Sequence, residues 1–167
     1  TGDAASYGES ENRAIQIAVE EINNAGGIDG RKIEVVTEDG KCDPQAGGTS
    51  AQKLVNIDKV KIIIGGACSG ETLAAAKITE PAKVILISPS ASSPKVSEAG
   101  DYVFRNKPGA KLEAQFLGDV IAAKLGIKKL YFLYDFDDYN EEKIKKKLDN
   151  IENKKVSIET GLIADQK

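Results

Sequence analysis

The sequence predicts the α/β fold class, with a doubly wound parallel sheet. Segments with helical periodicity alternate along the chain with short segments rich in β-branched residues, and glycine marks many of the short connections. Two of the strand candidates, "VKIIIGG" at 60–66 and "VILIS" at 84–88, are unbroken apolar runs. Such runs are typical of parallel strands that are buried on both faces.

The predicted helices have apolar residues at helical spacing or a residue typical of a first helical turn. In residues 8–25, Ile15, Val19 and Ile22 fall on one face, and Pro44 opens the second helix. The predicted helices are residues 8–25, 44–56, 70–80, 109–125 and 140–152.

The predicted strands are short and rich in Val, Ile, Tyr and Phe. They are residues 32–39, 60–66, 84–88, 101–106, 129–135 and 155–161. The segment "PSASSPKVSEAG" at 89–100 is a loop by composition. Because a doubly wound sheet normally begins with a strand and this chain begins with a loop and a helix, we expect an excerpt of a larger fold.

Composition limits the classes of function. With 167 residues, 41% of them hydrophobic, the chain is long enough for one domain with a real core or for a piece of something larger. The net charge of −3 argues against nucleic acid or an acidic membrane surface as the main partner. No run approaches the roughly 18 apolar residues of a membrane-spanning helix. The chain has no methionine and no signal-peptide pattern, so we expect it to start downstream of its gene's start, through processing or truncation.

Histidine and cysteine usage limits the chemistry further. Histidine is absent, which removes Ser-His and Cys-His catalytic pairs and leaves carboxylates alone for a zinc or iron site. The chain has two cysteines, Cys42 and Cys68. Their even number is compatible with one disulfide and equally with a reduced cytosolic pair.

The stretch "KIIIGGACSGET" at 61–72 fits three kinds of site. Its frame G-x-x-x-x-G-E-T has the spacing of a phosphate-binding P-loop, but Glu71 stands where the loop needs a lysine, and a carboxylate repels phosphate. Its frame G-x-C-x-G has the spacing of a nucleophile elbow with Cys68 as the nucleophile. This chain has no histidine to act as the base, although another part of the protein could supply one.

The third kind of site is a turn that holds a ligand. The strand ends at small residues and leads to a helix start near Ser69, where a hydroxyl and unpaired N–H groups attract a carboxylate or phosphate. After the next strand, "SPSASSP" at 88–94 supplies more hydroxyl and N–H groups, and Tyr7 lies in a third loop. Ligands of open α/β sheets bind at the carboxyl ends of strands, so we expect these loops to share one site.

These segments resemble the type I periplasmic binding proteins of ABC transporters, in the leucine/isoleucine/valine-binding protein family. The resemblance is carried by "GDAASYGES", "AVEEINNAGGIDGRKIEVVTEDGKCDPQ", "VKIIIGGACSGET", "ISPSASSP" and "LYDFDDY", and it weakens after Tyr139. It implies two α/β lobes that close on a ligand. Residues 1–108 would be the first lobe without its first strand and its return strands, and residues 109–167 the beginning of the second lobe. The chain would thus be the N-terminal portion of such a protein.

The resemblance also implies the site residues. The expected ligand-binding residues are Tyr7, Ala67, Ser69, Ser90, Ala91, Ser92 and Tyr139. Ser69 and Ser92 would hold the carboxylate of an amino acid, and the backbone carbonyl of Ser90 would receive its ammonium group. Ala91 lies between the two serines of its loop.

The other matched positions have supporting roles. Tyr7 and Ala67 would border the ligand's side chain, and Tyr139 would face it from the second lobe. Cys42 and Cys68 match a disulfide that ties a loop to the site. Closing a loop of this length should stabilise the fold by about 3 kcal/mol, and the bond implies an oxidising compartment.

For function, the resemblance implies a binding protein that is not an enzyme and uses no cofactor or metal. It would bind a small amino acid, branched-chain or otherwise aliphatic, and deliver it to an ABC transporter permease. Its location would be periplasmic or otherwise extracytoplasmic, with or without a lipid anchor, after removal of a signal peptide and without membrane insertion. Alternatives are a ligand-sensing receptor ectodomain of the same fold, a binder of an amide, urea or aromatic acid, and, most distantly, a cysteine hydrolase.

Overall fold

The computed structural model describes residues 1–2, 4–120, 124–126, 129–135 and 157–163. The helices are α1 (Ala5–Asn24), α2 (Pro44–Asn56), α3 (Ser69–Thr79), the 3₁₀ helix η1 (Pro94–Glu98) and α4 (Ala110–Asp119). The strands are β1 (Ile62–Ile64), β2 (Ile85–Ser88), β3 (Val103–Arg105), β4 (Lys129–Asp135) and β5 (Ser157–Ile163). The chain divides into two units, Thr1–Lys107 and Pro108–Lys167. Each unit is described by itself.

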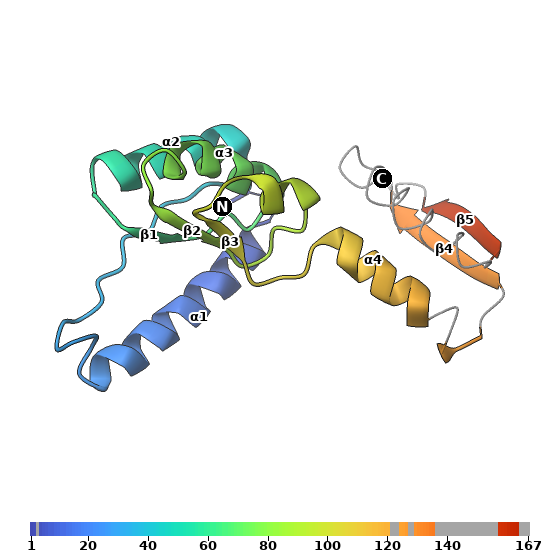
Figure 1. Cartoon of the computed structure of the whole chain (residues 1–167), viewed down its shortest axis with the longest axis horizontal. Helices are drawn as coiled ribbons and strands as arrows, with labels where there is room; N and C mark the ends of the chain where they lie inside the picture. The colour runs from blue at the N-terminus through green and yellow to red at the C-terminus, as the bar shows by residue number, and fades with distance from the viewer. Residues whose placement is uncertain (3, 121–123, 127–128, 136–156, 164–167) are drawn as a thin grey trace. The chain divides into compact units, whose positions relative to one another are not determined.

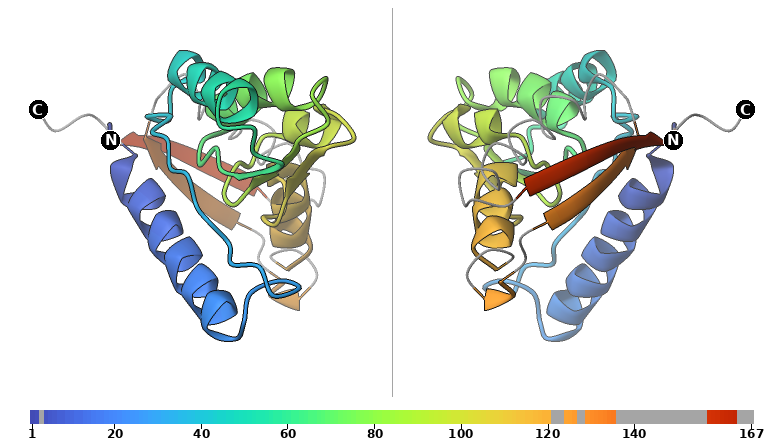
Figure 2. Two further views of the ribbon diagram at one scale, coloured as in Figure 1. Left: turned by 90° about the vertical axis from the view of Figure 1, so that its left-hand side faces the viewer. Right: turned by 90° about the vertical axis from the view of Figure 1, so that its right-hand side faces the viewer.

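The first unit is built on a three-stranded parallel sheet in the order β1-β2-β3. Helices α2 and α3 pack against each other on one side of this sheet, and α1 lies on the other side (Figures 1 and 2). Each strand is followed by a helical segment that leads to the next strand, as the alternating pattern predicts. The predicted α/β class with a parallel sheet is confirmed.

The core of the first unit lies between the sheet and the α2–α3 pair. The register places Ile63 opposite Leu86, and Leu86 opposite Val103, so these side chains share one face. Leu86 is fully buried, and small residues of the two helices, Ala51 and Ala75 among them, surround it. Small side chains let the helices approach the sheet closely.

The burial expected for the first strand of this sheet is wrong. Ile62 and Ile64 are 55% and 52% exposed, although their apolar run predicts a strand covered on both faces. The register puts them on the face opposite the core, together with Ile87 and Phe104. That face is open because α1, which lies on its side, buries none of its own residues. The second strand alternates in the same way, with Leu86 and Ser88 buried and its other residues half-buried.

The strand expected at 32–39 is also wrong. These residues have no regular secondary structure, although they are rich in β-branched residues. A strand needs a neighbour to receive its ladder hydrogen bonds, and the described part of the chain offers this segment none. An amide hydrogen bond pair holds its start instead, because Asn23 accepts from the N–H of Ile33 at 2.7 Å and donates to the carbonyl of Ile33 at 2.9 Å.

The helix ends follow the predicted chemistry. Pro44 occupies the first turn of α2, and the Asp43 side chain caps that helix by accepting from the N–H of Ala46 at 2.8 Å. Helix α1 ends before Gly26 and Gly27, which both have positive φ angles.

In the second unit, β4 and β5 form a parallel pair that Figure 2 shows side by side, with Lys129 opposite Ser157 and Asp135 opposite Ile163. The strand predicted at 129–135 is confirmed, and the last predicted strand is found two residues later than expected. The predicted helix 109–125 is an α-helix over Ala110–Asp119. The predicted helix 140–152 lies outside the described residues.

Candidate ligand-binding site

The loops that follow β1 and β2 meet at the same edge of the sheet. They are tied together by two hydrogen bonds, from the Ser90 hydroxyl to the Ala67 carbonyl at 2.8 Å and from the Ser93 N–H to the Ser69 hydroxyl at 3.1 Å. Parallel strands present their carboxyl ends at one edge, which is where open α/β sheets bind ligands. The structure therefore brings together Ala67, Ser69 and the serine loop, as the sequence predicts.

A buried polar network fixes the turn between β1 and α3. The carbonyl of Gly66 accepts from the hydroxyls of Thr72 at 2.9 Å and Ser88 at 2.6 Å, and both hydroxyls are fully buried. Gly66 has a φ of 70°, and a Cβ at this position would collide with Thr72. Only glycine fits such a turn without strain, so the start of α3 has a defined position relative to the end of β2.

A disulfide between Cys42 and Cys68 joins the loop before α2 to the start of α3. The two Cα atoms are 5.2 Å apart, which is within the usual range for such a bond. The predicted pairing is present. Since a disulfide-bonded sulfur is not a thiolate, Cys68 in this form cannot act as a nucleophile, and the nucleophile-elbow interpretation loses its central residue.

Glu71 occupies the first turn of α3, at the position where a P-loop would have its lysine. Its carboxylate accepts from the N–H of Cys68 at 3.4 Å, so the acid caps its own helix. Burial raises the pKa of Glu71 above its ordinary value, and the nearby charges of Glu11 and Asp39 raise it further, while the N–H groups of Cys68 and Ala67 act in the opposite direction. A carboxylate at this place does not suit a phosphate ligand.

Helix α1 reaches the site through Glu11. The Ser90 hydroxyl lies 2.6 Å from a carboxylate oxygen of Glu11, across 79 positions of sequence. Tyr7 lies one helical turn before Glu11, on the same side of α1, and is 65% exposed. The expectation that Tyr7 lies in a loop is wrong, because the residue belongs to the first turn of α1. Tyr139 lies outside the described residues.

The predicted residues differ in accessibility. Ser69, Ala91 and Ser92 are buried, whereas Ala67 and Ser90 are partly exposed. The N–H of Ala91 donates to the Ser88 hydroxyl at 3.1 Å, which turns the loop back over the end of β2. Their roles toward a ligand stay predictions.

Sequence reasoning missed two charged residues at this edge, Glu11 and Arg105. Arg105, at the end of β3, donates to the carbonyls of Ala91 at 3.4 Å and Ser93 at 2.8 Å and to the Ser97 hydroxyl at 2.6 Å. The strand at 101–106 was predicted, so the sequence could have indicated that Arg105, a cation near the carboxyl end of this strand, belongs to the same edge of the sheet. Glu11 gives no such signal, because it lies in a helix full of charged residues.

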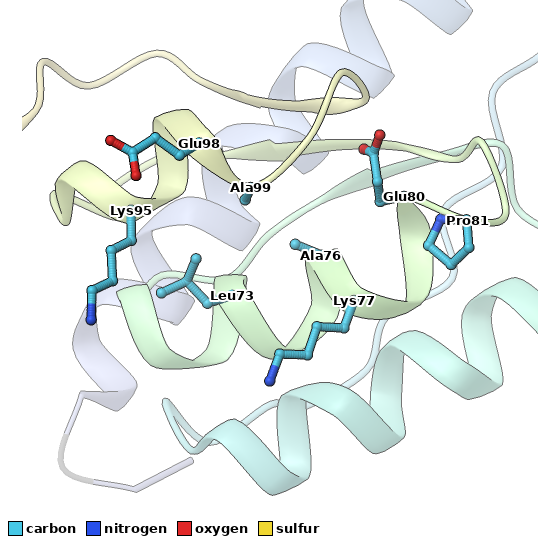
Figure 3. Close-up of a pocket in the computed structure, with 8 residues that line it drawn as sticks. All are labelled: Leu73, Ala76, Lys77, Glu80, Pro81, Lys95, Glu98 and Ala99. Atoms are coloured by element: carbon cyan, nitrogen blue, oxygen red, sulfur yellow. The ribbon is translucent and has the colours of Figure 1, made fainter.

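A hollow of about 630 Å³ lies elsewhere, between α3 and η1 (Figure 3). Its lining includes two lysines and two glutamates, and Glu80, one of the two, already accepts from the N–H groups of Asp101 at 3.0 Å and Tyr102 at 2.9 Å. None of the predicted ligand-binding residues lines it, so it is separate from the candidate site.

Comparison with known proteins agrees with this fold. A sequence model of the periplasmic binding protein family matches residues 1–156. The chain is 34% identical to the leucine-, isoleucine-, valine-, threonine- and alanine-binding protein of Pseudomonas aeruginosa, over 100% of this chain and 45% of that protein.

Two solved structures are also similar. One is the branched-chain amino acid transporter substrate-binding protein LivJ of Streptococcus pneumoniae, in complex with isoleucine (TM-score 0.81, 34% identity, 99% of this chain and 48% of that one). The other is a solute-binding protein of an ABC transporter from Rhodopseudomonas palustris, in complex with 3,4-dihydroxybenzoic acid (TM-score 0.82, 28% identity, 98% and 44%).

The fold defines an α/β protein with a parallel sheet, whose paired loops lie at the carboxyl ends of the strands. The chain belongs to the periplasmic binding protein family, and its relatives within it are the leucine/isoleucine/valine-binding proteins. It spans less than half the length of the relatives it matches. Within the part of the chain that the structure describes, no helix has the length and apolar character needed to cross a membrane.

Proposed function

We propose that this chain supplies one wall of the binding site of an extracytoplasmic solute-binding protein, which passes a small amino acid to an ABC transporter permease. In this proposal residues 1–108 belong to the first lobe and residues 109–167 begin the second. The protein is a carrier and not an enzyme, and the amino acid is branched-chain or otherwise aliphatic.

The observation that carries the proposal is the joining of the two loops at the carboxyl ends of β1 and β2. Two hydrogen bonds, from the Ser93 N–H to the Ser69 hydroxyl and from the Ser90 hydroxyl to the Ala67 carbonyl, hold hydroxyl groups beside the start of α3. Helix starts and hydroxyls favour a carboxylate, and the carbonyls of the same loops favour an ammonium group. The names of the relatives, which include binders of leucine and isoleucine, support this ligand class.

An aromatic carboxylic acid is the second candidate ligand, because the Rhodopseudomonas palustris neighbour was solved with 3,4-dihydroxybenzoic acid. Such a ligand has the carboxylate but lacks the ammonium group. It would use the Ser69 side of the site and leave the carbonyl oxygens without a charged partner.

Thermal unfolding of the longest form of the protein tests both candidates. The panel contains leucine, isoleucine, valine, their amides, and benzoate derivatives. A ligand at about 100 times its dissociation constant stabilises a protein by about 2.7 kcal/mol, which raises the melting temperature by several degrees.

We expect the shift for an aliphatic amino acid and its loss in Ser69→Ala. The matched control is Ser10→Ala, whose exposed hydroxyl donates to the Ser6 carbonyl within α1. A shift with benzoates alone would favour the second candidate, and no shift with any compound would contradict both.

A further inference from the structure

Arg105 holds the serine loop from the end of β3. Its Nη1 group donates to the Ser93 carbonyl at 2.8 Å and to the Ala91 carbonyl at 3.4 Å, and its Nη2 group donates to the Ser97 hydroxyl at 2.6 Å. The sheet register places Arg105 opposite Ser88, the last residue of β2 before the loop. Because a guanidinium group is planar and its donors have fixed directions, these bonds hold the loop in one position relative to the sheet.

Ser93 connects this arginine to the start of α3. Its carbonyl accepts from Arg105, and its N–H donates to the Ser69 hydroxyl at 3.1 Å. Ser69 is buried, and because its oxygen accepts from Ser93, the proton of its hydroxyl is turned away from Ser93. A single residue, bonded on both sides of its backbone, therefore links the position of Arg105 to the orientation of the Ser69 hydroxyl.

We propose that Arg105 is a positioning residue, which acts through Ser93 to orient the Ser69 hydroxyl toward the carboxylate of the ligand. This inference rests on the proposed function and adds to it a residue that does not contact the ligand. A donor that is already oriented binds a carboxylate without the cost of ordering it first.

The bonds of Arg105 favour positioning over direct attraction of the ligand by charge. Arginine commonly binds a carboxylate through two parallel bonds. Among the residues that the structure describes, no acidic side chain is ion-paired with Arg105, and its donors contact uncharged oxygens of the loop and of Ser97. The guanidinium group is thus used to hold the loop.

Isothermal titration calorimetry on the longest form of the protein tests the proposal with a double-mutant cycle of Arg105→Met and Ser69→Ala. Methionine keeps a long side chain at position 105 and removes every donor. Arg31→Met, which removes an exposed arginine after α1, is the matched control. The probe is whichever of L-leucine, L-isoleucine and L-valine gives the largest shift in the thermal panel.

We expect each single substitution in the cycle to weaken binding of this amino acid about tenfold, because the carboxylate loses an oriented donor. The double variant should bind within about twofold of Ser69→Ala alone, because Arg105 then has no hydroxyl left to orient. Arg31→Met should bind like the unmodified protein.

Ser93→Pro is a second test, which leaves Arg105 in place. Proline lacks the N–H that donates to Ser69, and the φ of −59° at Ser93 is one that proline adopts. We expect a loss of affinity similar to that of Arg105→Met. Ser93→Ala, which removes the hydroxyl and keeps the N–H, is its control and should bind like the unmodified protein.

Losses that multiply in the double variant would show that Arg105 acts by its charge or through general stability, and they would overturn the proposal. Unchanged binding in Arg105→Met or in Ser93→Pro would overturn it as well. The proposed function would stand in each of these cases. If the unmodified protein binds none of the three amino acids, the proposed function fails and this inference fails with it.

Discussion

The two faces of the β1-β2-β3 sheet are built from similar apolar residues and differ in what covers them. On the α2–α3 side Leu86 is fully buried, whereas Ile64 and Phe104 on the opposite side are about half exposed, at 52% and 51%. The strand sequence determines which residues share a face. The helices packed against each face determine how much those residues contribute to stability.

Truncating a side chain on each face is the sharpest way to test this difference. Leu86→Ala should lower the free energy of unfolding by about 4 kcal/mol, because it leaves a cavity in a fully buried site. Ile64→Ala should lower it by about 1 kcal/mol or less, because that side chain is already half in water. Urea denaturation of both variants measures the two values. Equal losses would mean that the open face is covered in solution.

Breaking the disulfide is a second test of how much the side of the sheet covered by α2 and α3 contributes to stability. The bond between Cys42 and Cys68 closes a loop on the side where α2 and α3 pack. Reducing it should lower the free energy of unfolding by about 3 kcal/mol, because the unfolded chain gains freedom. Denaturation with and without reductant measures the change, and the Cys42→Ser/Cys68→Ser double variant, which should not respond to reductant, is the control. A native protein with two titratable thiols and an unchanged denaturation curve would contradict the prediction.

Glu71 should give the smallest effect, and one that depends on pH. Its pKa is raised in the folded protein, chiefly by burial, so the folded state holds its proton more tightly than the unfolded state does. The stability associated with that proton is present in acid and is lost as the pH rises through the raised pKa. At neutral pH the folded protein therefore bears the cost of a charged, half-buried carboxylate.

Glu71→Gln removes that cost while keeping an oxygen that can accept from Cys68. We expect the variant to be more stable than the unmodified protein at neutral pH, and we expect this difference in unfolding free energy to shrink toward acid pH, where Glu71 is protonated. Denaturation curves between pH 4 and about pH 8 measure both, with the exposed Glu20→Gln as control. A variant that is less stable than the unmodified protein at neutral pH would show that the charged carboxylate stabilises α3 more than its burial costs.

Local features of this fold could be predicted from sequence. Pro44 after the Asp43 cap marks the start of α2, and the glycines after α1 mark its end. Both signals depend only on a few neighbouring residues. The parallel sheet and the meeting of the Ser69 and Ser90 loops also follow from the order of helices and strands.

Features that depend on distant partners could not be predicted in this way. The segment 32–39 has strand composition, but a strand forms only where a neighbour offers its ladder groups. The exposure of Ile62 depends on which helix covers its face of the sheet, and the neighbouring residues in the sequence do not reveal that. The contact between Glu11 and Ser90 spans 79 positions and needs the folded structure to be seen. The disulfide was predicted because of the family resemblance, since the cysteine count left it open.

The bracing of the serine loop by Arg105 has a consequence for the kinetics of binding. Its guanidinium group donates to the carbonyls of Ala91 and Ser93 and to the hydroxyl of Ser97, so bonds within the chain hold this loop in place. A ligand that meets a preformed loop does not have to spend binding energy on ordering it. We expect the association rate to be insensitive to the loop, so that differences in affinity among ligands arise from how fast each one leaves.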